Sequence, residues 1–177
     1  MPRIEKIAIK DVKLRTFITE DTTRNDLVHH VYDVTYGLVN NHKDTLVVLD
    51  DSIVRGTTLK ESILTMLDRL QPKKIIVVSS APQIRYPDCY GIDMSKMGSF
   101  VAFQAAVRLW KIKDEKFLPD LFRRCKEELQ KPPLEMQNLV KEVYAPFTDE
   151  EISKEIANIV KPNHIFSDVE VIYQTID

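Results

Sequence analysis

One apolar run, at residues 45–49, ends in two adjacent carboxylates, Asp50 and Asp51, and this feature constrains the fold more than any other. Its β-branched residues are typical of a strand buried in a parallel sheet. A helical pattern follows, and residues 74–79 form a second apolar run. A strand, a helix and a strand within about 35 residues predict a right-handed crossover. Both strands should therefore be parallel, with any site at their carboxyl ends.

A small polar loop, residues 52–58, joins this strand to the helix. Thr58 and Glu61 stand three residues apart and predict a capping box that opens the helix. The first N–H groups of a helix lack intrahelical acceptors, and the helix dipole adds positive charge, so the loop suits a phosphate. Gly56 would let the backbone approach that phosphate closely.

The carboxylates of Asp50 and Asp51 are acceptors that suit sugar hydroxyls, or a divalent metal with its waters. A phosphate site beside groups that bind a diol is the pattern expected for a ribose 5-phosphate. A receiver domain also places acidic residues at strand ends, but that alternative does not account for the Gly-Thr-Thr loop.

Residues 48–58 resemble the phosphoribosyl pyrophosphate (PRPP) motif of type I phosphoribosyltransferases, in the form found in glutamine PRPP amidotransferases. Residues 80–94 are similar to a second segment of that family, which runs from Ala-Pro to Tyr-Gly-Ile-Asp. Residues 15–18 resemble, more weakly, the start of the family's flexible loop. The resemblance covers roughly residues 10–105. It implies an α/β fold, a partial type I phosphoribosyltransferase fold with a parallel sheet flanked by helices and a helical C-terminal extension.

The resemblance also implies roles for individual residues. Asp50 and Asp51 would bind the ribose hydroxyls directly or through Mg²⁺, and the loop would hold the 5-phosphate. The residues expected to bind PRPP are Asp50, Asp51, Ser52, Ile53, Val54, Arg55, Gly56, Thr57 and Thr58. Those expected at the rim of the site, or along the path by which ammonia arrives, are Arg85, Tyr90, Gly91, Ile92 and Asp93.

The segment before the motif departs from the family pattern. Asp26, Leu27 and Val28 stand where a run of basic residues would be expected, and this leaves Arg24 as the candidate for binding pyrophosphate. The apolar spacing from Arg24 onward predicts a helix that ends near Gly37.

In the reaction that the resemblance implies, ammonia released from glutamine displaces pyrophosphate from PRPP and gives 5-phosphoribosylamine for purine synthesis. The family's glutaminase domain begins with a cysteine nucleophile, whereas residue 2 here is Pro2. In the family, a pyrophosphate-binding loop precedes the flexible loop, and the few residues before that point in this sequence leave no room for it. The chain is therefore expected to be the second half of a phosphoribosyltransferase domain, either a fragment of a longer enzyme or a truncated paralogue. It is expected to be inactive alone, and its partners would include the missing glutaminase and phosphoribosyltransferase half. A non-catalytic module that binds ribose phosphates or nucleotides stays open as the alternative.

Some amidotransferases carry an iron–sulfur cluster, but the cysteine pattern here does not fit one. Cys89 falls one position from the family's ligand site, and no Cys-x-x-Cys pair follows. No cluster is expected, and Cys89 and Cys125 are expected to be reduced thiols.

The pattern of apolar residues after residue 110 predicts a mainly helical region. We therefore expect a partial phosphoribosyltransferase domain at 1–110 and a helical region at 111–177. Thr148 and Glu151 predict a second capping box, and residues 169–173 a closing strand.

A formal net charge of −2 and a pI near 6.1 give no electrostatic reason to propose nucleic acid or membrane partners. No apolar signal core or membrane span is apparent, so a cytoplasmic location is expected. The resemblance implies a homo-oligomer for the full-length enzyme.

Overall fold

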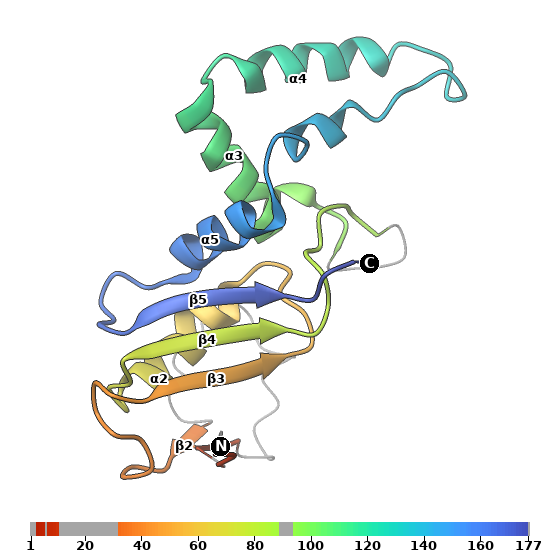
Figure 1. Cartoon of the computed structure of the whole chain (residues 1–177). Helices are drawn as coiled ribbons and strands as arrows, with labels where there is room; N and C mark the ends of the chain where they lie inside the picture. Colours follow the sequence, from red (N-terminus) through yellow and green to blue (C-terminus); the bar gives the residue numbers. More distant parts are fainter. Residues whose placement is uncertain (1–2, 6, 11–31, 89–93, 177) are drawn as a thin grey trace.

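The computed structural model describes residues 3–5, 7–10, 32–88 and 94–176, and Figure 1 shows their arrangement. Its centre is a parallel sheet of β3 (Thr45–Asp50), β4 (Lys74–Ser79) and β5 (Asp168–Tyr173), in the order β3-β4-β5. The predicted crossover is confirmed, because β3 and β4 pair in parallel with Asp50 opposite Ser79. A separate antiparallel pair joins β1 (Ala8–Lys10) to β2 (Tyr32–Val34).

A continuous helix connects β3 to β4. It begins at Thr57, continues as a π-helix in η2 (Leu59–Ile63) and becomes α-helical in α2 (Leu64–Asp68). After β4, a short 3₁₀ turn η4 (Met97–Ser99) leads into α3 (Val101–Lys113), which is followed by α4 (Phe117–Glu128), a 3₁₀ segment η5 (Leu139–Val143) and α5 (Asp149–Val160). In Figure 1, α3 and α4 lead away from the sheet, whereas α5 returns beside β5.

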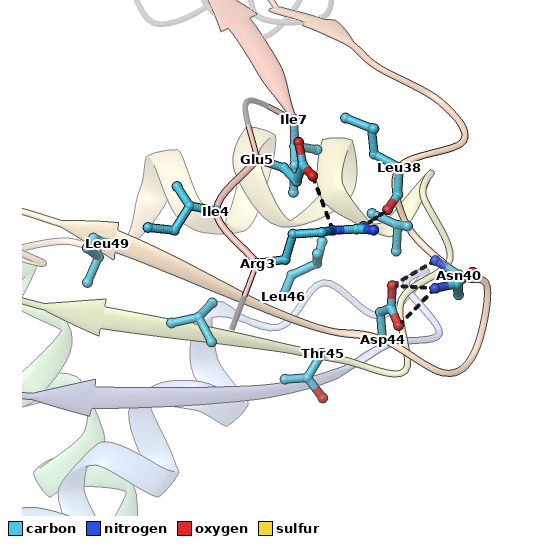
Figure 2. Close-up of a pocket in the computed structure, with 12 residues that line it drawn as sticks. Arg3, Ile4, Glu5, Ile7, Leu38, Asn40, Asp44, Thr45, Leu46 and Leu49 are labelled. Carbon is cyan, nitrogen blue, oxygen red and sulfur yellow. Dashed lines mark hydrogen bonds and ion pairs between the residues drawn. The ribbon is translucent and has the colours of Figure 1, made fainter. Parts of the chain in front are cut away.

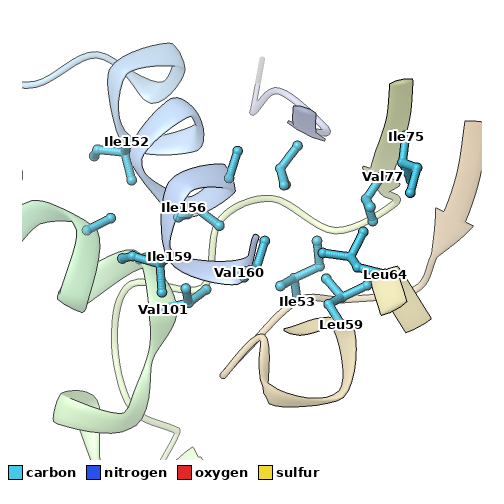
Figure 3. Close-up of a cluster of buried hydrophobic side chains, with 14 of the residues drawn as sticks. Ile53, Leu59, Leu64, Ile75, Val77, Val101, Ile152, Ile156, Ile159 and Val160 are labelled. Carbon is cyan, nitrogen blue, oxygen red and sulfur yellow. The ribbon is translucent and has the colours of Figure 1, made fainter. Parts of the chain in front are cut away.

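The hydrophobic core lies on one face of the sheet and combines residues from both halves of the chain. Ile75 and Val77 of β4 are fully buried near Leu64 of α2, and Ile156 of α5 belongs to the same hydrophobic cluster (Figure 3). The opposite face is open on β3, where the side chains of Val47 and Leu49 are 63% and 78% exposed. This alternation follows from the two-residue period of a strand.

Aromatic contacts hold α3, α4 and η5 together. The Trp110 ring stacks on Phe117 with a centroid distance of 3.5 Å, and its Nε1–H donates to the Val143 carbonyl at 2.9 Å. The predicted capping box at Thr148 is confirmed: the Glu151 N–H donates to the Thr148 hydroxyl at 3.2 Å, and the Thr148 N–H donates to the Glu151 carboxylate at 2.8 Å.

These observations confirm the predicted fold class, an α/β fold with a parallel sheet flanked by helices. The helix predicted from residue 24 to residue 37 is wrong at its end, because Tyr32–Val34 forms a strand that pairs with β1. Pairing across the sheet overrode the local helical spacing there. The rest of that segment, with Arg24, lies outside the described residues.

The division into 1–110 and 111–177 stays a prediction. The second part is mainly helical as expected, but β5 pairs along its whole length with β4 of the first part. Within the described ranges, no helix combines the length and the apolar character that crossing a bilayer requires.

Candidate functional site

The two carboxylates lie at the carboxyl end of β3, as the sequence predicted. Asp50 is the last residue of the strand and half-buried, whereas Asp51 is exposed at the start of the loop. One oxygen of Asp50 accepts the Asp51 N–H at 2.9 Å, and one oxygen of Asp51 accepts the Ser52 N–H at 2.8 Å. Burial raises the pKa of the Asp50 carboxyl, and the neighbouring Asp51 carboxyl raises it further. A ligand that donates hydrogen bonds, or a cation, would relieve this cost.

The loop that follows is anchored to the core at two points. The Ile53 side chain is only 4% exposed, and the Val54 carbonyl accepts the N–H of Val101, the first residue of α3, at 2.8 Å. Gly56 then adopts φ +71° and packs so closely on α5 that a Cβ there would lie 2.7 Å from Val160 Cγ1. Glycine is required at this position because both the dihedral angle and the packing exclude a side chain.

The helix begins earlier than predicted, which changes the role of Thr58. Thr58 has helical dihedral angles (φ −60°, ψ −39°), and its side chain makes no capping hydrogen bond, so the predicted capping box with Glu61 is wrong. The helix already starts at Thr57, and its first full turn is a π-helix, a form often found at functional sites. Both threonines are exposed at the helix N-terminus, where a hydroxyl could bind an anion.

The carboxyl end of β4 is tied to the same loop. The Ser80 N–H donates to the Asp50 carbonyl at 2.9 Å, and the Ala81 N–H donates to the Asp51 carbonyl at 3.1 Å. The Ser80 hydroxyl also donates to the Asp51 carbonyl, at 3.1 Å. These bonds fix the main chain of the acidic pair and use none of its carboxylate oxygens.

The predicted rim residue Arg85 is described, and its side chain is directed at the start of α5. Its guanidinium pairs with Asp149, donates to the Gln83 side chain at 2.8 Å and lies 5.2 Å from the centroid of the Tyr144 ring. The Tyr144 hydroxyl in turn donates to the Arg85 carbonyl at 2.8 Å. These contacts attach the rim segment to α5, and a direct part for Arg85 in the site stays a prediction. Tyr90, Gly91, Ile92, Asp93, Cys89 and Arg24 lie outside the described residues.

Tyr173, at the end of β5, is a neighbour of the site that no local sequence pattern indicated. The register places Asp50, Ser79 and Tyr173 in one row across the three strands. Burial raises the pKa of Tyr173, and the charge of Asp50 raises it further. The strand at 169–173 was predicted, but its place beside β4 could not be read from a local pattern.

A cavity of about 660 Å³ lies beside the edge strand β3 (Figure 2). Its walls include Ile4, Leu38 and Leu49. Figure 2 shows the Arg3 side chain between Glu5, which it contacts at 3.2 Å, and the Leu38 carbonyl, to which it donates. This cavity contains neither of the predicted acidic residues.

The donor set at the site fits Mg²⁺ only in part. Among the described residues there is no group of three or more histidine, cysteine or acidic side chains placed to hold a metal. Mg²⁺ is commonly bound through one or two carboxylates together with substrate phosphates and waters. Asp50 and Asp51 therefore suffice only for an ion that arrives with its substrate.

The structure thus brings together a strand that ends in an acidic pair, a glycine-containing loop and a helix N-terminus, the arrangement expected for a site that binds a sugar phosphate. Comparison with curated proteins agrees: parts of the chain are similar to amidophosphoribosyltransferases. The chain is 52% identical over 62 residues to the protein of Haemophilus influenzae and 46% identical over 57 residues to that of Escherichia coli, which is 34% and 32% of this chain. With the protein of Bacillus subtilis it shares 36% identity over 94 residues, or 52% of this chain.

These matches cover 12%, 11% and 19% of the relatives, so the chain corresponds to a small part of each. The similarity is consistent with a fragment of the phosphoribosyltransferase domain. A solved structure of the B. subtilis enzyme complexed with ADP and GMP matches 52% of this chain and 20% of its own, with 36% identity and a TM-score of 0.37. No protein-family model matches the chain.

Proposed function

We propose that this chain is the phosphoribosyltransferase portion of an amidophosphoribosyltransferase, the enzyme that transfers ammonia from glutamine to PRPP. The observation that carries the proposal is the close packing of Gly56 at φ +71° directly after the acidic pair, within a chain similar to enzymes of that name. This packing holds the loop in one shape between the acidic pair and the N-terminus of the helix, where N–H groups without intrahelical acceptors can bind a phosphate.

In this proposal, each part of the site holds a different part of PRPP. The carboxylates of Asp50 and Asp51 accept hydrogen bonds from the ribose hydroxyls, and the backbone of residues 53–57 holds the 5-phosphate. The hydroxyls of Ser52, Thr57 and Thr58 add further donors. Mg²⁺, when bound, would offset the negative charge of the pyrophosphate leaving group.

Chemistry at the anomeric carbon needs no nucleophile from these residues. Displacement of pyrophosphate by ammonia develops positive charge on the ribose ring, so the protein mainly has to hold the sugar still and exclude water. Arg24 would contact the pyrophosphate, and the rim segment from Arg85 to Asp93 would border the path of the ammonia. The product is 5-phosphoribosylamine, and the reaction takes place in the cytoplasm.

A second candidate is a non-catalytic module that binds ribose phosphates or nucleotides. The acidic and apolar residues Asp26, Leu27 and Val28, in place of basic ones, favour it. Both candidates require binding, but only the first predicts amine synthesis after the chain is combined with a glutaminase and the first half of a phosphoribosyltransferase domain.

Isothermal titration calorimetry tests the common step. The chain is titrated with PRPP and Mg²⁺, with ribose 5-phosphate and with AMP. Wild type should bind all three, and Asp50→Asn with Asp51→Asn should weaken each by about tenfold or more, because buried or charge-assisted hydrogen bonds are lost. Glu115→Gln with Glu135→Gln is the matched control, since it removes two exposed carboxylates far from the loop. Equal affinities in wild type and the acidic-pair variant would refute the assigned diol contact.

A further inference from the structure

The hydroxyl of Tyr173 is a buried polar group that the proposed mechanism does not use. It is shielded from water and has no hydrogen-bond partner among the residues that the structure describes. A buried hydroxyl without a partner costs about 1–3 kcal/mol, so native proteins seldom keep one without a reason.

The sheet register places this side chain on the same face of the sheet as Asp50. Asp50, Ser79 and Tyr173 are in register on neighbouring parallel strands, which lie about 4.8 Å apart. Residues in register project from the same face of the sheet. The burial of neighbouring residues shows which face this is. Val77 and its partner Val171, two residues earlier on the same face, are buried, whereas Ile172 on the other face is 42% exposed.

Ser79 lies between the other two and leaves space for them to meet. Its side chain is short, 1% exposed, and its hydroxyl donates to the Ala81 carbonyl at 2.8 Å. The proton of Ser79 is therefore already used, and the ring of Tyr173 can lean across β4 without competing with a long side chain. A phenol has an ordinary pKa near 10, so the hydroxyl carries a proton that it can donate at neutral pH.

Asp50 is the acceptor that this arrangement provides. One of its oxygens accepts the Asp51 N–H, and a carboxylate can accept several more hydrogen bonds. Ionisation of the Asp50 carboxyl also costs free energy, because the group is half-buried beside a second carboxylate. A donor from β5 would stabilise it and fix its rotamer.

We propose that Tyr173 is a positioning residue for Asp50: its hydroxyl donates to the Asp50 carboxylate when that carboxylate turns to receive the ribose hydroxyls of the substrate. The inference rests on the proposed function, because it assigns Asp50 to the ribose. It makes the last strand of the chain a part of the sugar site, so that the site is assembled from all three strands of the sheet.

The test compares ribose 5-phosphate with inorganic phosphate, both titrated calorimetrically into wild type, Tyr173→Phe, Asp50→Asn and the double variant. Phenylalanine keeps the ring and its packing. If Tyr173 acts through Asp50, Tyr173→Phe weakens ribose 5-phosphate by about tenfold, the loss of one charge-assisted hydrogen bond, and leaves inorganic phosphate within about twofold. In the double variant the loss should equal that of Asp50→Asn alone, because the two residues form one unit.

Tyr144→Phe is the matched control. Its hydroxyl is also partly buried, but it donates to the Arg85 carbonyl, so this variant should leave both affinities unchanged. Additive losses in the double variant, equal losses for both ligands, or no loss in Tyr173→Phe would each overturn the inference while leaving the proposed function intact. A wild-type chain that binds neither compound would overturn the proposed function, and the inference with it.

Discussion

Gly56 lies in direct contact with Val160, so the loop after β3 packs against the end of α5, a helix from the other end of the chain. A Cβ at Gly56 would approach Val160 Cγ1 to 2.7 Å and Val101 Cγ2 to 3.6 Å. The shape of the candidate phosphate loop therefore depends on α3 and α5, although neither helix supplies a residue that the site was predicted to use.

Replacing Gly56 by alanine should destabilise the protein by about 2–4 kcal/mol, combining the cost of a left-handed backbone with that of overpacking. Urea denaturation measures the change. Gly98→Ala is the control, because a Cβ there meets nothing within 4 Å and its φ is not positive, so its effect should be small. Adding Val160→Ala to Gly56→Ala should recover the steric part of the loss; two costs that simply add would contradict the packing argument.

Asp50→Asn should make the folded protein more stable at neutral pH. The folded-state pKa of Asp50 is raised above its ordinary value, so the ionised form is disfavoured in the folded state relative to the unfolded state. This destabilisation is fully present above the raised pKa and is lost as the pH falls through it toward the ordinary value of 3.8. The advantage of the asparagine variant in free energy of unfolding should therefore shrink between neutral and acidic pH.

Thermal unfolding of Asp50→Asn and wild type across this pH range checks the direction. Glu115→Gln, at an exposed position, should show no such advantage. Equal stability of Asp50→Asn and wild type at neutral pH would mean that burial of the carboxylate costs nothing.

The two threonines with capping-box spacing should behave differently. Thr148→Ala should lower the free energy of unfolding by about 1 kcal/mol, because it removes the cap of α5. Thr58→Ala should change stability by less than about 0.5 kcal/mol, as expected for an exposed residue, because its side chain caps nothing. Chemical denaturation compares them, and a similar loss in both variants would show that Thr58 caps the helix after all.

Arg85→Met should loosen the rim segment more than it lowers global stability. The guanidinium joins Gln83 and Asp149, but Asp149 is largely exposed, so the ion pair adds less than about 1 kcal/mol. Hydrogen exchange of the main-chain N–H groups in residues 83–86 should become faster, since the segment loses its ion pair with α5 and keeps only the hydrogen bonds that the Gln83 amide donates to α5 and that Tyr144 donates to the Arg85 carbonyl. Arg108→Met is the control, because its ion pair with Glu155, at 3.5 Å, joins α3 to α5 elsewhere. Unchanged exchange in the rim would refute this role of Arg85.

The local sequence determined the elements that need only their own residues. The apolar runs at residues 45–49 and 74–79 predicted the parallel strands, and the connection between them fixed Asp50 and Asp51 at the carboxyl edge. Thr148 and Glu151 predicted a capping box for the same reason, since a cap is made within one turn of helix. The similarity to amidophosphoribosyltransferases was also readable from the residues around the acidic pair.

The choice of the distant segments that complete the site depends on tertiary packing. Tyr32–Val34 forms a strand because β1 pairs with it, and Thr58 has no capping role because the helix already begins at Thr57. The contact of Gly56 with Val160 and the row from Asp50 to Tyr173 join residues from opposite ends of the chain. Local periodicity describes which face of an element is apolar, but it carries no information on the neighbour that covers that face, and packing alone makes that choice.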